Sequence, residues 1–110
     1  MGIKMMKKAE VVPNVIGGEK VLYFIRIETK HTLTGNTKQI VNGKLIGPVY
    51  GLAICKSDNP EGYYLFGCDE NWKSITDTFH ESIEDAMDQG EFEYKGTFND
   101  WKISRSINPD

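Results

Sequence analysis

Stretches with the character of β-strands recur through residues 10–79 of this 110-residue chain, and a single stretch after them has helical periodicity. Because no helix separates one strand from the next, the strands are expected to have short connections and to pair antiparallel. The order of elements predicts an α+β fold, in which an antiparallel, meander-like sheet of about five to six strands carries one C-terminal amphipathic helix on one face. One helix is too narrow to cover such a sheet, which leaves the opposite face for solvent, for the C-terminal tail or for a dimer contact.

Turn signals rich in Gly, Pro and Asn separate the predicted strands. The strands are expected at residues 10–16, 20–29, 49–55, 63–68 and 74–79. Residues 32–38 are typical of a polar turn, and Asn42-Gly43 predicts a tight hairpin between two short strands. In the longest strand, regular alternation places four apolar residues on one face: Val21, Tyr23, Ile25 and Ile27.

Two small residues, Gly51 and Ala53, lie on one side of the predicted strand 49–55. Small side chains leave room for a bulky neighbour, and the helix is the simplest candidate. The same space is also a candidate ligand pocket between the helix and the sheet. The residues expected to line it are Tyr50, Tyr63, Tyr64 and Met87.

The helical stretch begins at Ser82, which opens a sequence similar to a capping box. Residues at helical spacing form one inward-facing stripe: Ile83, Ala86, Met87, Gly90 and Tyr94. Gly96 is well placed to end the helix in a left-handed conformation. The tail that follows contains Trp101 and Ile103, which indicate one more short strand or a strap across the helix.

Length and composition indicate a single domain at residues 9–110, preceded by a flexible basic N-terminus at residues 1–8. No apolar run approaches the roughly 20 residues of a membrane helix, and no apolar stretch typical of a secretory signal follows the basic N-terminus. We therefore expect a cytoplasmic protein of a bacterial type, without membrane contact.

Charge is distributed unevenly along the chain. Residues 1–55 carry eight Lys/Arg against three Asp/Glu, whereas residues 56–110 carry five against thirteen. The acid is densest in residues 77–93, and residues 74–94 contain no Lys or Arg that could form the usual i,i+4 ion pairs. Without such pairs, the acidic side chains of the helix repel one another. An unneutralised acidic helix is typical of proteins that attract a basic partner by long-range electrostatics.

The leading functional hypothesis is therefore a non-enzymatic protein–protein interaction module, with an immunity- or inhibitor-like protein as its most concrete form. Its predicted partner face combines acidic side chains with an aromatic anchor: Glu81, Glu84, Asp85, Asp88, Glu91 and Trp72, with Tyr94 as a second possible anchor. The alternative is a small-ligand-binding or regulatory domain that uses the pocket described above. A homodimer through the open sheet face or an edge strand is compatible with either hypothesis.

A hydrolase-type enzyme is the least favoured hypothesis. Cys68, His80 and Asp77 supply the residue types of a thiol triad, but Asp77 and His80 are three apart on a strand and should point to opposite faces. Cys55 and Cys68 are expected to be reduced and buried, because their hairpin holds the sulfur atoms too far apart to bond. No motif for a cofactor, a metal ion or nucleic acid is found in the sequence.

Overall fold

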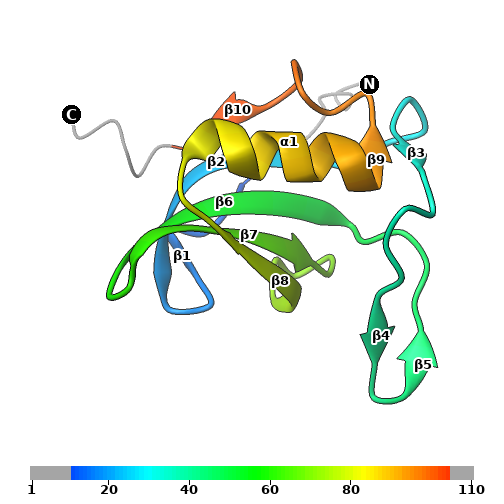
Figure 1. The fold of residues 1–110 in the computed structure, drawn as a ribbon, viewed down its shortest axis with the longest axis horizontal. Coiled ribbons are helices and arrows are strands. Elements are labelled where there is room, and N and C mark those ends of the chain that lie inside the picture. The colour runs from blue at the N-terminus through cyan, green and yellow to red at the C-terminus, as the bar shows by residue number, and fades with distance from the viewer. Residues whose placement is uncertain (1–10, 105–110) are drawn as a thin grey trace, which may run out of the picture.

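The computed structural model describes residues 11–104, which form an antiparallel sheet with one helix across it (Figure 1). The strands of this sheet are β1 (Val15–Ile16), β2 (Glu19–Arg26), β6 (Gly51–Asp58), β7 (Glu61–Cys68), β8 (Ser74–His80) and β10 (Lys102–Ile103). The helix is α1 (Ile83–Glu93). The spatial order is β1-β2-β6-β7-β8, and β10 also pairs with β2. The predicted α+β class is thereby confirmed.

Two further strand pairs lie outside the main sheet. β3 (Thr32–Leu33) pairs with β9 (Tyr94–Lys95), and β4 (Ile40–Val41) pairs with β5 (Lys44–Leu45). The β4–β5 pair is the hairpin predicted from Asn42-Gly43, and both of these turn residues have positive φ. By contrast, the predicted polar turn at residues 32–38 contributes a strand, β3. Its partner β9 is distant in sequence, which explains why the local pattern did not indicate a strand.

The face assignment predicted for the longest strand is wrong at one residue. Val21 is opposite Cys55, but Tyr23 is opposite the next residue, Ile54, so a β-bulge lies between Val21 and Tyr23. A bulge adds one residue and reverses the alternation of side chains beyond it. Val21 consequently packs on one face of the sheet, and Tyr23, Ile25 and Ile27 pack on the other.

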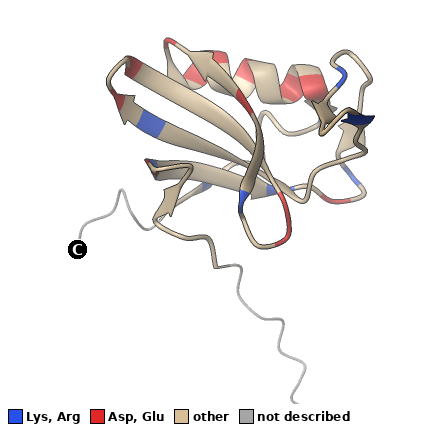
Figure 2. Cartoon of the chain, turned by 90° about the horizontal axis from the view of Figure 1, so that it is seen from below, with Lys and Arg blue, Asp and Glu red and all other residues tan. Residues whose placement is uncertain are grey.

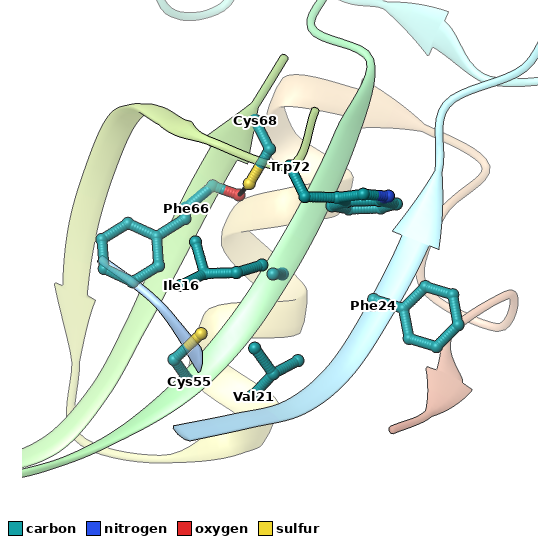
Figure 3. Close-up of a cluster of buried hydrophobic side chains, with 8 residues drawn as sticks. Ile16, Val21, Phe24, Cys55, Phe66, Cys68 and Trp72 are labelled. Atoms are coloured by element: carbon teal, nitrogen blue, oxygen red, sulfur yellow. Dashed lines mark hydrogen bonds between the residues drawn. The ribbon is translucent and has the colours of Figure 1, made fainter. Parts of the chain in front are cut away.

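The buried side chains form two clusters, one on each face of the sheet. The helix-side cluster joins β6 residues Leu52 and Ile54 to Ala86 of α1 and to Tyr94. The opposite cluster contains Ile16, Val21, Phe24, Ala53, Cys55, Phe66, Cys68 and Trp72. In Figure 3 these side chains lie in front of the sheet, with the helix behind it. The second face of the curled sheet is therefore covered from within the chain.

The small side chains of β6 accommodate a tryptophan rather than the helix. A Cβ atom added to Gly51 would lie 2.4 Å from the ring of Trp72. Trp72 packs edge-on against Phe24 and Tyr50, with ring centroids 5.9 and 5.7 Å away. The expectation that the helix covers Gly51 and Ala53 is therefore wrong, because Trp72, from the turn after β7, fills this space.

The helix starts where it was predicted to start. Ser82 is the N-cap, and its hydroxyl accepts a hydrogen bond of 3.0 Å from the backbone N–H of Asp85. The helix ends earlier than Gly96 suggested, because Tyr94 is already the C-cap residue. The tail contributes β10, which confirms the short strand expected around Ile103.

We expect Gly51→Ala to destabilise the fold by about 1–3 kcal/mol, because overpacking a well-filled core forces side chains out of their rotamers. Gly47→Ala is the matched control, since a Cβ atom there meets nothing within 4 Å. Urea denaturation followed by tryptophan fluorescence measures both changes. In the double variant with Trp72→Leu, the cost of Gly51→Ala should shrink; equal costs in both backgrounds would contradict the packing described.

Candidate functional site

A shallow groove between α1 and the end of β8 brings exposed acidic side chains next to an exposed aromatic ring. The groove has a volume of about 320 Å³ and is lined by His80, Asp85, Asp88, Gln89 and Phe92. Figure 2 shows acidic segments following one another along α1. We call this groove, together with the exposed residues Glu81 and Glu84 that precede Asp85 in the chain, the acidic groove.

A chain of hydrogen bonds fixes the wall of the acidic groove at the start of the helix. His80 Nδ1 lies 3.0 Å from Asp85 Oδ2, and His80 Nε2 lies 2.7 Å from Thr78 Oγ1. Because an ionised carboxylate only accepts hydrogen bonds, Nδ1 donates to Asp85, and Nε2 shares a second hydrogen bond with the threonine hydroxyl. This chain connects edge strand β8 to the first turn of α1.

Three acidic residues of the helix are bound within the protein. Asp85 contacts His80, and the buried Glu93 accepts a hydrogen bond of 2.7 Å from Gln89 Nε2. The Glu91 carboxylate accepts hydrogen bonds from the backbone N–H groups of Phe98 and Gly96, at 3.0 and 3.1 Å. These bonds, with that from Phe98 the strongest, lower the pKa of Glu91.

The other acidic residues predicted for the partner face remain open to solvent. Glu81, Glu84 and Asp88 are exposed, and within residues 11–104 none of them takes part in an ion pair. Phe92 is 50% exposed at the far end of the groove. The solvent-facing side of α1 therefore combines unneutralised carboxylates with one large apolar ring.

The predicted aromatic anchors are not part of this surface. Trp72 is only 6% exposed and lies on the sheet face away from the helix. Tyr94 is 2% exposed, and its hydroxyl accepts a hydrogen bond of 3.0 Å from the Val49 N–H. Phe92 was missed as a surface aromatic, although its helical phase, four residues after Asp88, places it on the solvent side.

The four residues proposed to line a ligand pocket are divided between the two faces of the sheet. Tyr50 and Tyr64 pack against the cluster that contains Trp72, whereas Tyr63 and Met87 pack against the helix-side cluster. Side chains on opposite faces of a sheet cannot line one cavity. These residues are therefore parts of the two cores.

The residues of the thiol triad are also not brought together. Cys68 pairs with Ser74 at one end of β7, whereas His80 pairs with Tyr63 at the other end, and His80 contacts Asp85 instead of Asp77. Both cysteines are free and buried, as predicted. Burial raises the pKa of Cys68 to about 12 and also raises that of Cys55.

Residues 11–104 contain no group of three or more His, Cys, Asp or Glu side chains that could hold a metal ion.

A second polar cluster surrounds His31, and no local pattern in the sequence indicates it. Its Nδ1 accepts a hydrogen bond from the Glu28 N–H, and its Nε2 lies 2.7 Å from Asp100 Oδ2. Lys30 Nζ lies 3.1 Å from the same oxygen, and the hydrogen bonds from His31 and Lys30 lower the pKa of Asp100. His31 and Asp100 are 69 positions apart, so no local spacing indicates this link between the segment after β2 and the C-terminal segment.

The chain matches no protein-family model, no curated protein and no solved structure. Over the described part of the chain, no helix has the length and apolar character needed to cross a membrane.

The raised pKa values predict unreactive thiols in the native protein, because the thiolate is the nucleophilic form. We expect a thiol-specific reagent such as dithionitrobenzoate to modify neither cysteine at neutral pH without denaturant. Both should react in urea. Rapid modification of the folded protein would contradict the burial of Cys55 and Cys68.

Glu91→Gln should destabilise the protein by about 1 kcal/mol at neutral pH, the scale of one hydrogen bond to backbone N–H. A carboxylate whose folded pKa is lowered contributes stability above its unfolded pKa, and this contribution is lost as pH falls through the folded pKa. The wild type and the variant should therefore converge in acid when unfolding is followed against pH. The control is Glu84→Gln, which should change stability little; a constant gap for Glu91→Gln would contradict the role of its charge.

Proposed function

We propose that this protein is a protein–protein interaction module that holds a basic partner in the acidic groove. An immunity- or inhibitor-like protein, which blocks a basic protein by covering its charged surface, is the most concrete form of this function. The observation that carries the proposal is that Glu81, Glu84 and Asp88 are exposed without an ion pair in the described part of the chain.

The exposed carboxylates support the proposal because they should speed the association with a basic partner. Carboxylates that face solvent without nearby cations produce a local negative potential, which raises the rate of encounter with a positive surface. The effect extends over about 8 Å at physiological ionic strength, so salt should weaken it. Residues 74–94 contain no Lys or Arg that could reduce this negative potential.

The exposed ring of Phe92 would add binding energy in a complex, beyond the electrostatic attraction of the carboxylates. Aromatic residues surrounded by polar groups are frequent hot spots of protein interfaces, because burying a ring removes much apolar surface from water. Phe92 lines the groove together with Asp88 and Gln89. A partner segment that alternates lysine with apolar residues would meet both features.

The hydrogen bonds at the two ends of α1 also support binding by a rigid surface. Ser82 and His80 fix the first turn, and at the last turn Thr34 Oγ1 and Asn36 Nδ2 donate to the Phe92 carbonyl, at 2.6 and 2.9 Å. A preorganised surface loses little conformational entropy when it binds.

The test uses the full chain, labelled with ¹⁵N and titrated with a synthetic peptide of alternating Lys and Leu. We expect amide signals of α1 to shift most, and the affinity to fall as salt rises. The groove variant Glu84→Lys with Asp88→Lys should bind at least about tenfold more weakly at low salt. A peptide of alternating Glu and Leu should not bind.

The matched control is Glu61→Lys with Glu70→Lys, which makes the same change in net charge at two exposed positions outside the groove, the first residue of β7 and the turn after β7. It should retain most of the affinity for the basic peptide. Equal losses in the two double variants would mean that binding follows net charge alone, and would contradict the proposed site. Circular dichroism establishes that each variant is folded.

A further inference from the structure

The hairpin β4–β5 is a projecting arm with an apolar surface. It forms a two-stranded sheet of its own and extends away from the helix (Figure 1). Ile40 and Leu45 are directly opposite each other, and they are 65% and 66% exposed. An isolated hairpin is only marginally stable in water, so a paired apolar surface of this kind gains stability when another surface covers it.

The arm is also basic. Lys44 lies in β5, Lys38 precedes β4, and both are exposed. Residues 29–57, which include the whole arm, contain no Asp or Glu. The surface that covers the arm should therefore offer acidic side chains around an apolar centre.

The acidic groove of this same chain has that composition, with Asp85 and Asp88 beside the exposed ring of Phe92. We propose that the β4–β5 arm of one copy docks in the acidic groove of a second copy. This inference rests on the proposed function, since it names the basic partner of the same groove. A symmetric contact between two acidic grooves is disfavoured by repulsion, whereas arm and groove attract each other.

Arm and groove are different surfaces, so two copies can exchange arms about a twofold axis, or the contact can repeat head-to-tail into rings or open chains. The arm presents little apolar area, so one contact belongs to the weak class of interfaces. Association should therefore increase steadily with concentration and decrease with salt.

The fixed turn of the arm supports docking as a preformed unit. Asn42 and Gly43 have φ values of 53° and 78°, as the tight turns of two-residue hairpins require. The Ile46 N–H donates to the Gln39 carbonyl at 2.9 Å, which extends the pairing toward the body of the domain. The hairpin geometry is thus set before a partner is met.

Sedimentation velocity of the full chain over a range of concentrations, at low salt and at about 0.5 M salt, tests the proposal. We expect the wild type to self-associate at low salt and to dissociate at high salt. The arm variant Lys38→Glu with Lys44→Glu, and the groove variant Glu84→Lys with Asp88→Lys, should each weaken self-association at least about tenfold. Glu61→Lys with Glu70→Lys should retain it.

Mixing the two charge-reversed variants provides the decisive control. The acidic arm of one then matches the basic groove of the other, and the basic arm matches the acidic groove, so the mixture should associate although each variant alone does not. A monomeric wild type at every concentration would overturn the inference, and so would association that survives both variants. Binding of the Lys-Leu peptide by a monomeric wild type would leave the proposed function standing, whereas failure of the peptide to bind would count against that function itself.

Discussion

Helix α1 carries five carboxylates in eleven residues and no cation, so its stability depends on the groups that meet its two ends. At the N-terminus, Ser82 caps a free N–H group and His80 holds Asp85, where negative charge is favourable. At the C-terminus, the negative charge of Glu91 is unfavourable next to the negative end of the helix dipole. Its carboxylate is stabilised instead by hydrogen bonds from two backbone N–H groups of the following turn. Side chains outside the helix thus stabilise a segment that would repel itself in isolation.

The fold was predictable where local pattern and tertiary structure agree. Turn residues separated the strands, Ser82 marked the helix start, and Asn42-Gly43 marked a hairpin. The face of Val21 was not predictable, because a bulge depends on register with β6 and leaves no clear signal in one strand. The position of Trp72 was missed for a related reason: Gly51 indicates that something bulky is close, but not which side chain supplies it.

The candidate site was predictable in composition but not in detail. The count of acidic residues identified the segment around α1, yet it could not separate Glu84 and Asp88, which face solvent, from Glu91 and Glu93, whose carboxylates accept hydrogen bonds from within the chain. That separation depends on where the chain turns after the helix, since the Glu91 carboxylate needs the Phe98 N–H beside it. The links of His31 to Asp100 and of Thr34 to Phe92 join residues far apart in sequence, where periodicity carries no information.

One segment, residues 27–50, connects the two surfaces that the proposals use. It leaves the sheet after β2 and returns at β6, and on the way Thr34 binds the last turn of α1 before the chain enters the β4–β5 arm. The same segment therefore carries the basic arm and contacts the Phe92 end of the acidic groove. The hydrogen bonds from Thr34 and Asn36 to the Phe92 carbonyl join the segment that carries the arm to the last turn of α1.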